Sequence, residues 1–134
     1  DMFISMAYVV LDAAKGRLIY GNAGHEPPIL YRNGICIPLA ADGMVLGVQP
    51  EGEYQEKRME LAPNDILVLF TDGLTSAQDQ DGVEFSRNGL EEVVGELAGA
   101  ELTAAEMVDK IMKKVEAFEK RGGDDKTLLI IKKL

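Results

Sequence analysis

The first half of the chain carries short apolar runs separated by turn residues, a pattern that predicts β-strands. Residues 2–11 form a nearly continuous run rich in Ile, Val, Tyr and Phe, which indicates a strand covered on both faces. Residues 12–16 predict a turn and residues 17–20 a returning strand. Residues 54–61 and 66–70 are further predicted strands, and the second of these is wholly apolar and therefore expected to be buried.

Two turn sequences indicate how these strands connect. The Asn33-Gly dipeptide lies between predicted strands at residues 29–32 and 35–37 and favours the two positive φ values of a type I′ hairpin. The Pro63-Asn-Asp sequence predicts a tight turn before the next strand, because proline presets φ and asparagine tolerates the left-handed region. Strands joined by such short turns run antiparallel.

The second half of the chain changes to a helical period. Apolar residues recur at spacings of three and four along residues 90–98, which indicates one face of a helix. Thr103 and Glu106 form a capping box that opens a second helix, and glycines at residues 122–123 are expected to end it. Residues 127–131 predict a last buried strand. Strands first and helices later predict an α+β domain on a mostly antiparallel sheet.

Composition and charge narrow the classes of function. The chain has 134 residues, the length of a single domain, with 14 Lys+Arg against 23 Asp+Glu and a formal net charge of −9. This acidic excess argues against a nucleic-acid partner or an anionic membrane surface. The apolar runs are too short for membrane insertion and no signal peptide is recognisable, so we expect a cytoplasmic protein. A single cysteine and a single histidine exclude an internal disulfide and a two-histidine mechanism.

Two acidic motifs beside apolar strands are candidates for a metal site. A Thr-Asp72-Gly motif follows the strand at residues 66–70 directly, and a Gly-Gly-Asp124-Asp125 motif comes just before the last strand. Each motif could simply cap a turn or lie in a solvated loop, which is the commoner role of such acids. Carboxylates that converge from separate strands are, however, the hard oxygen ligands that Mg²⁺ or Mn²⁺ needs.

The segment Asn22-Ala-Gly-His25-Glu-Pro-Pro is the other dense motif. His25 could act as an acid or a base, whereas a lone histidine in such a turn more often fixes the turn by hydrogen bonding. Cys36 lies in a short predicted strand and is expected to be a small core residue, not a nucleophile. No Walker A, GxGxxG, HExxH or GxSxG motif occurs.

In this order and spacing, the motifs resemble the bacterial PPM-type serine/threonine phosphatases of the SpoIIE/RsbU class. The resemblance runs from residue 2 to residue 131 and rests on NAGH followed by PP, LGV, TDG after a buried strand, and GGDDKT before the last strand. It implies an antiparallel β-sandwich flanked by helices, with the N-terminal part of the fold missing. Residues 1–134 would then be a single, partial phosphatase domain.

The resemblance also implies a chemistry and a site. In the family, two Mn²⁺ or Mg²⁺ ions activate water for hydrolysis of phosphoserine or phosphothreonine on a regulatory phosphoprotein, such as an anti-sigma-factor antagonist in bacterial signalling. Matched by motif, Asp72 and Asp124 are implied catalytic metal ligands, and Asp125 is an implied supporting neighbour. Gly73 and Gly123 would let the backbone bend around the site.

Parts of the family pattern are absent from this chain. The GD-type aspartate and the D-x-S-G-x-G segment that bridge the two ions do not occur, and Ser76 stands where the family commonly has Glu. We therefore expect little phosphatase activity from this chain alone. The alternatives are a catalytically inactive phosphatase-like module that binds a regulatory partner, and a structural, dimer-forming domain within a sensor protein. A sandwich without its N-terminal strands would also leave an unpaired edge beside residues 2–11, so we expect the chain to self-associate.

Overall fold

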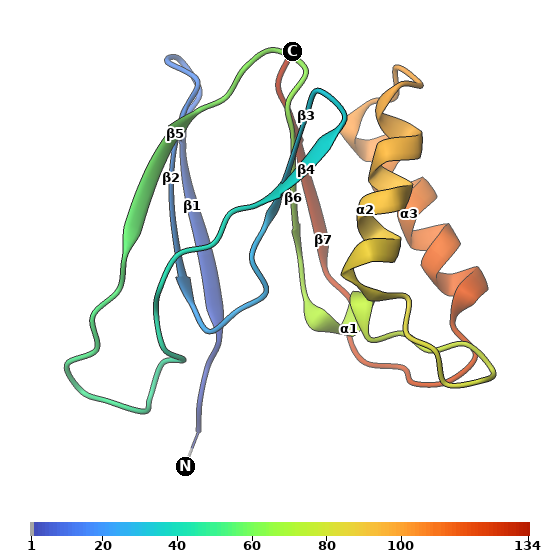
Figure 1. Cartoon of the computed structure of the whole chain (residues 1–134), viewed down its shortest axis with the longest axis horizontal. Coiled ribbons are helices and arrows are strands. Elements are labelled where there is room, and N and C mark those ends of the chain that lie inside the picture. Colours follow the sequence, from blue (N-terminus) through green and yellow to red (C-terminus); the bar gives the residue numbers. More distant parts are fainter. Residues whose placement is uncertain (1) are drawn as a thin grey trace.

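The computed structural model describes residues 2–134 as two antiparallel sheets and three helices. The elements are β1 (Met6–Asp12), β2 (Arg17–Ala23), β3 (Ile29–Arg32), β4 (Ile35–Pro38), β5 (Glu56–Glu60), β6 (Ile66–Phe70), α1 (Asp72–Thr75), α2 (Ser86–Ala98), α3 (Ala104–Phe118) and β7 (Leu128–Lys132). The strand orders are β1-β2-β5 and β4-β3-β6-β7. Figure 1 shows the sheets facing each other, with α2 and α3 beside the four-stranded sheet. The predicted α+β sandwich is therefore confirmed.

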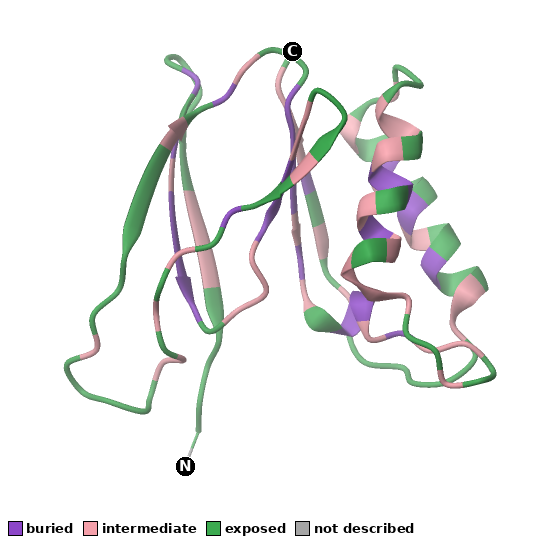
Figure 2. Ribbon diagram, viewed as in Figure 1, coloured by how far each residue is buried: buried purple, intermediate pink, exposed green. Residues whose placement is uncertain are grey.

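Two hydrophobic clusters hold these layers together. Val68 of β6, Val94 of α2 and Ile111 of α3 belong to the cluster between the four-stranded sheet and the helices. Leu18 of β2 and Leu67 of β6 belong to the cluster between the two sheets. Successive residues of a strand point to opposite faces, so β6 contributes to both clusters and is apolar throughout. Figure 2 shows the same two buried layers. Among residues 2–134, no helix is long and apolar enough to cross a membrane.

The predicted turns and the predicted cap are present. Asn33 and Gly34 have φ values of 50° and 81°, as a type I′ hairpin requires, and Asn64 has a φ of 72° in the turn before β6. At the start of α3, the Thr103 backbone N–H donates to the Glu106 carboxylate at 2.9 Å. The Glu106 N–H donates to the Thr103 hydroxyl at 3.2 Å, which completes the capping box.

The end of the last helix differs from its prediction. α3 ends at Phe118, and Glu119 already has an extended backbone with φ −69° and ψ 121°. Gly122 and Gly123 do adopt positive φ, at 106° and 131°, but they shape the loop that leads to β7 and do not cap the helix. The helical stripe of apolar residues stops at Phe118, which removes the packing that would extend the helix further.

The first strand is also less covered than its apolar sequence predicts. β1 is an outer strand of the three-stranded sheet, and β7 is an outer strand of the four-stranded sheet. Val10 on β1 is 56% exposed, and Leu129 on β7 is 49% exposed. Exposed outer strands offer unpaired backbone groups as well as apolar side chains to another chain.

We expect the isolated 134-residue chain to self-associate, because pairing of β1 or β7 with a second chain would cover their unpaired backbone groups and exposed apolar side chains. Val10→Lys is expected to weaken the association, since a charge on an outer strand opposes the addition of another strand. Sedimentation velocity at increasing concentration measures the self-association of the wild type and of the Val10→Lys variant. Met44→Lys, at an exposed loop position outside the sheets, is the matched control. A wild-type chain that stays monomeric at the highest concentration would contradict the prediction.

A largely buried ion pair, not anticipated from the sequence, fixes the turn before β6. Arg32 Nη2 lies 2.6 Å from Asp65 Oδ2 and Arg32 Nε lies 3.0 Å from Asp65 Oδ1. The Ala62 N–H donates to Asp65 Oδ2 at 2.8 Å. Burial raises the pKa of the Asp65 carboxyl, but the hydrogen bonds from Arg32 and Ala62, together with the Arg32 charge, outweigh burial and hold that pKa below its usual value.

Candidate functional site

The two acidic motifs lie at the same end of the four-stranded sheet, where β6 ends and β7 begins. Phe70 of β6 pairs with Leu128 of β7. Beyond this pair, the Thr71 N–H donates to the Thr127 carbonyl at 3.1 Å, and the Thr127 N–H donates to Thr71 Oγ1 at 3.0 Å. Because the strands are antiparallel, the residues after Phe70 run alongside those before Leu128. The register therefore brings the two motifs together.

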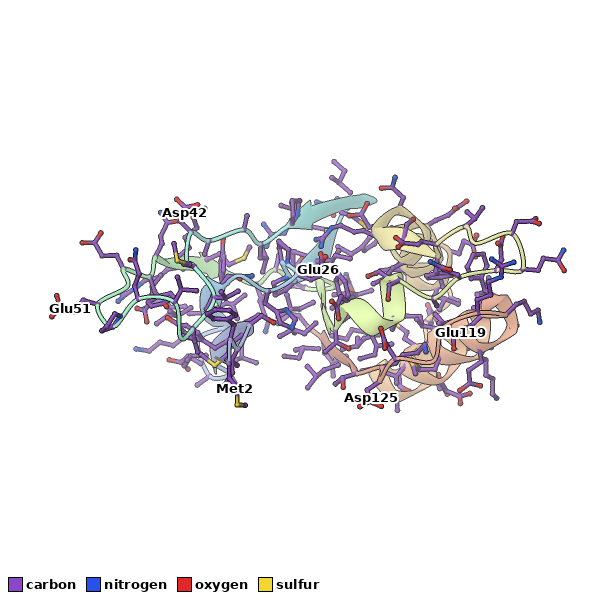
Figure 3. All side chains as sticks on the ribbon, turned by 90° about the horizontal axis from the view of Figure 1, so that it is seen from below. Met2, Glu26, Asp42, Glu51, Glu119 and Asp125 are labelled. Atoms are coloured by element: carbon purple, nitrogen blue, oxygen red, sulfur yellow. The ribbon has the colours of Figure 1, made fainter. Side chains whose placement is uncertain are left out.

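Gly73 lies directly against the second motif. A Cβ at this position would clash with the carbonyl oxygen of Asp125 and would lie 3.3 Å from Cβ of Asp124. The requirement for glycine is thus one of space, because α1 and the Asp124-Asp125 loop approach each other too closely for a side chain. Gly123 serves differently, since its φ of 131° is one that other residues rarely adopt. Figure 3 views this end of the molecule, with Asp125 and Glu26 on either side of α1.

A lysine within the GGDDKT motif holds the two aspartates of that motif in place, a role that the motif alone does not reveal. Lys126 Nζ donates to the Asp124 carbonyl at 3.1 Å and to the Glu119 carboxylate at 2.9 Å. The Lys126 and Glu119 side chains are only 12% and 21% exposed. The Lys126–Glu119 ion pair connects the Asp124-Asp125 loop to Glu119, the residue that follows α3. Lys126 thereby links the Asp124 carbonyl to the end of that helix.

The carboxylates at this end of the sheet are the type of ligand that a hard divalent cation prefers, but they are few. Asp72, Asp124 and Asp125 are all exposed and offer carboxylate oxygens, the ligands that Mg²⁺ and Mn²⁺ prefer. Over residues 2–134, no group of three or more His, Cys, Asp or Glu side chains is placed to hold one ion. An ion bound by Asp72 or Asp124 would therefore need further ligands, from water or from outside this part of the chain.

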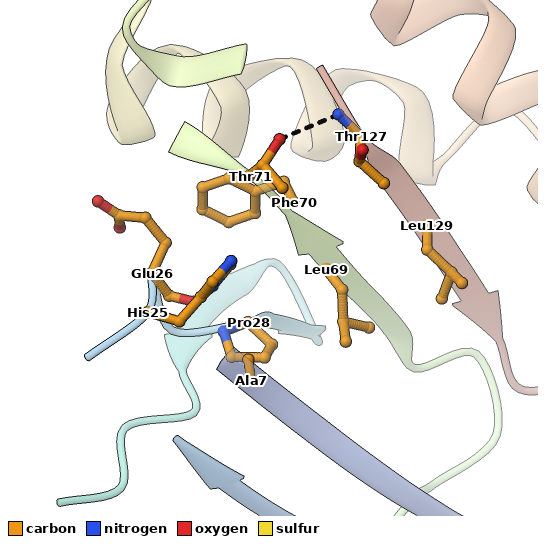
Figure 4. A pocket seen from close by; sticks show the side chains of 9 residues that line it. All are labelled: Ala7, His25, Glu26, Pro28, Leu69, Phe70, Thr71, Thr127 and Leu129. Carbon is orange, nitrogen blue, oxygen red and sulfur yellow. Dashed lines mark hydrogen bonds between the residues drawn. The ribbon is translucent and has the colours of Figure 1, made fainter. Parts of the chain in front are cut away.

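The His25 loop and Asp72 line the same cavity. A polar cavity of about 310 Å³ is lined by Ser5, Gly24, His25, Glu26, Thr71 and Asp72. A more apolar cavity of about 210 Å³ begins at the same loop and reaches between the sheets to Ala7 and Leu129 (Figure 4). His25 and Glu26 line both cavities, so the loop stands between the end of β6 and the interior of the sandwich.

Asn22, more than the His25 ring, fixes the shape of this loop. The His25 N–H donates to Asn22 Oδ1 at 2.7 Å, and Asn22 Nδ2 donates to the His25 carbonyl at 2.9 Å. Asn22 is buried, which shields both bonds from water. The His25 ring makes one local contact, from Nδ1 to the Glu26 carbonyl at 3.0 Å. The turn is thus held through main-chain atoms of His25, and most of the ring remains available.

Arg87 of α2 anchors the same loop from the helix side. Its Nη1 donates to the Pro27 carbonyl at 2.8 Å, and the Glu26 carboxylate lies 3.6 Å from the same nitrogen. The guanidinium also lies over the Phe70 ring, 5.5 Å from its centroid, in a cation–π arrangement. Arg87 therefore links α2, the loop and the end of β6. No sequence motif includes Arg87, and its role comes from contacts sixty residues apart in the chain.

Comparison with known proteins identifies the family. The model of the family described as "Stage II sporulation protein E (SpoIIE)" matches residues 1–134, which is the whole chain. The chain belongs to the SpoIIE family. The family resemblance inferred from the NAGH, TDG and GGDDKT motifs is therefore confirmed, and the chain shares the fold of solved PP2C phosphatase domains.

Individual relatives agree with this assignment and show how much of each the chain covers. Phosphoserine phosphatase RsbU of Bacillus subtilis (strain 168) is 31% identical over 138 residues, which cover 99% of this chain and 40% of RsbU. The solved PP2C domain of SiaA from Pseudomonas aeruginosa has a TM-score of 0.80 at 20% identity, covering 96% of this chain and 51% of that one. The phosphatase domain of SpoIIE from Bacillus subtilis has a TM-score of 0.72 at 16% identity, covering 96% and 56%. The chain thus spans about half of the solved domains whose fold it shares.

Proposed function

We propose that this chain forms the C-terminal part of a metal-dependent protein serine/threonine phosphatase domain that acts on a regulatory phosphoprotein in bacterial signalling. The observation that carries the proposal is the close approach of Gly73 to Asp124 and Asp125, which joins the two acidic motifs of the family at one end of a sheet. Phosphorylated anti-sigma-factor antagonists are the candidate substrates that the family resemblance suggests.

In the proposed site, Asp72 and Asp124 would each provide a carboxylate ligand for a pair of Mn²⁺ or Mg²⁺ ions, and Asp125 would support Asp124. Such ions, when bound, lower the pKa of a bound water and offset the charge of the phosphoryl oxygens. This chemistry needs no cysteine or histidine nucleophile, which suits a chain with one residue of each type. The contacts of Lys126 with Asp124 and Glu119 hold the second ligand segment in place.

The remaining ligands are proposed to come from the part of the phosphatase domain that lies outside the region shared with this chain. The chain covers 40% of RsbU, so most of that relative has no counterpart in residues 1–134. The lack of a group of three ligating side chains over residues 2–134 also supports a site whose ligands are shared between this chain and the rest of the domain. A complete site would then need both parts of the domain.

We expect the isolated chain to release little or no phosphate from a phosphoserine protein, whereas the full-length gene product does so in Mn²⁺. Both ions must be held together to stabilise a dianionic phosphoryl group, and a net charge of −9 repels the substrate without them. Phosphate release with and without a chelator measures the difference. A folded full-length product that is inert with Mn²⁺ and with Mg²⁺ would contradict the proposal. Robust hydrolysis by the isolated chain would show that residues 1–134 form a complete metal centre.

The alternative is a phosphatase-like module that binds a regulatory phosphoprotein without hydrolysing it. It is favoured by the absence, over residues 2–134, of a three-ligand group and by Ser76 at a position where the family commonly has Glu. The Ser76 N–H donates to the Asp72 carbonyl at 2.8 Å, so this residue lies beside the proposed ligand. Stable retention of a phosphoprotein by the full-length product, with no turnover in Mn²⁺, would favour the alternative.

A further inference from the structure

We infer that Lys126 and Glu119 are positioning residues that set how tightly the Asp124 segment binds a divalent ion. The inference rests on the proposed function, and it deepens that function by assigning part of the metal affinity to two residues that are not themselves ligands. Lys126 Nζ donates to the Asp124 carbonyl at 3.1 Å, and it lies 2.9 Å from each carboxylate oxygen of Glu119. The pair therefore acts on the ligand segment through its main chain.

The loop that carries Asp124 has few hydrogen bonds to hold it. Gly122 and Gly123 precede Asp124 with φ values of 106° and 131°, and glycine has the largest conformational freedom of all residues. In the described part of the chain, residues 122–125 take part in a single hydrogen bond, which runs from Lys126 to the Asp124 carbonyl. Without this bond, two adjacent glycines would leave the direction of the Asp124 carboxylate loosely determined.

The chain on either side of this loop is anchored by other hydrogen bonds. The Arg121 N–H donates to the Gln78 carbonyl at 3.0 Å, and the Thr127 N–H donates to Thr71 Oγ1 at 3.0 Å. These two anchors fix where the loop begins and ends, but they leave the segment between them free of main-chain pairing. The position of that segment therefore depends on the Lys126 side chain.

Burial and a firm attachment make the ion pair suited to this role. The Lys126 and Glu119 side chains are 12% and 21% exposed, so water competes only weakly for their hydrogen bonds. Glu119 directly follows α3, and that helix is packed in the core through Met107, Ile111 and Val115. The Asp124 carbonyl is thus tied to a packed helix and not to another loop.

The charges of the pair allow positioning to be separated from electrostatics. A lone ammonium group near the acidic motif would repel a divalent cation, and the Glu119 carboxylate offsets this charge. Replacing Lys126 by an uncharged residue removes the positive charge, which by electrostatics alone would strengthen cation binding. The same replacement removes the hydrogen bond to Asp124, which by positioning would weaken cation binding. The two explanations therefore predict changes of opposite sign.

The test measures Mn²⁺ affinity by titration calorimetry in the full-length gene product. Lys126→Met should lower the affinity by about 10–100-fold, the usual effect of removing a residue that positions a metal ligand. The double variant Lys126→Met/Glu119→Gln should show a similar loss, although it leaves the net charge unchanged and no buried charge unpaired. Lys126→Arg should keep the wild-type affinity, because arginine retains the charge and can donate to both acceptors.

Lys120→Met is the control variant, because it removes the same charge from an exposed position next to Glu119 and should not lower Mn²⁺ affinity. The melting temperature shows which variants are folded, and if Lys126→Met is not, the double variant provides the same comparison. The positioning role is wrong if folded Lys126→Met binds Mn²⁺ as tightly as the wild type or more tightly, or if the double variant keeps wild-type affinity. A wild type that binds no Mn²⁺, or Asp124→Asn with unchanged affinity, would instead overturn the proposed function, and the positioning role with it.

Discussion

Replacing Asp72 by Asn in the full-length gene product is expected to reduce turnover of a phosphoserine protein by about 10²-fold or more, with the fold intact. Asparagine keeps the shape of the side chain but removes the charge that would attract a divalent ion. The Ser76 N–H at 2.8 Å and the Thr75 hydroxyl at 3.3 Å donate to the Asp72 carbonyl, a main-chain group that asparagine retains. The side chain itself is exposed, so its replacement removes no core packing.

The measurement is kcat with Mn²⁺, together with Mn²⁺ affinity and melting temperature for each variant. Asp109→Asn is the matched control, because Asp109 is an exposed aspartate of α3 that pairs with Lys113 one turn further along the helix. This variant should keep wild-type kcat. Wild-type turnover by Asp72→Asn would refute the assignment of Asp72 as a ligand. A loss of both turnover and melting temperature would indicate a structural role for the side chain.

The features that the sequence predicted well are those determined by neighbouring residues. The Asn33-Gly34 hairpin, the Thr103–Glu106 capping box and the strand that ends at Phe70 each depend on a few adjacent positions, and each is present. The approach of Gly73 to Asp124 and Asp125 brings the two acidic motifs together, which the local pattern left as one of two alternatives and the family resemblance favoured. Nothing in the local pattern specifies that β6 and β7, far apart in the chain, are hydrogen-bonded neighbours.

The features that the sequence did not predict depend on contacts between distant positions. Arg87 reaches Pro27 across sixty residues, and Arg32 reaches Asp65 across thirty-three. Each is an ordinary charged residue in its own segment, and its partner is set by how the strands and helices are arranged. The exposure of β1 was missed for the same reason, because an apolar run does not reveal whether a neighbouring strand covers it.

Asp65→Asn is expected to lower the free energy of unfolding by about 3 kcal/mol at neutral pH, the lower end of the range for a broken buried ion pair. The Asp65 side chain is 2% exposed, so its loss of charge leaves Arg32 without a buried counter-ion. Arg32 is 31% exposed, which lets water relieve part of this cost. The asparagine oxygen can also still accept the Ala62 N–H, as the carboxylate does at 2.8 Å.

The same pair predicts how stability changes with pH. Because folding lowers the pKa of Asp65, its contribution is fully present above the unfolded value of about 3.9 and is lost as pH falls through the lower folded value. The difference between wild type and Asp65→Asn should therefore shrink on acidification. Urea unfolding at neutral and acidic pH measures this, with Glu60→Gln as the control for an exposed pair, since Glu60 and Arg17 are 78% and 61% exposed. The control should change stability by less than about 1 kcal/mol. A constant difference across pH for Asp65→Asn would mean that the lost stability comes from packing and not from the charge of the carboxylate.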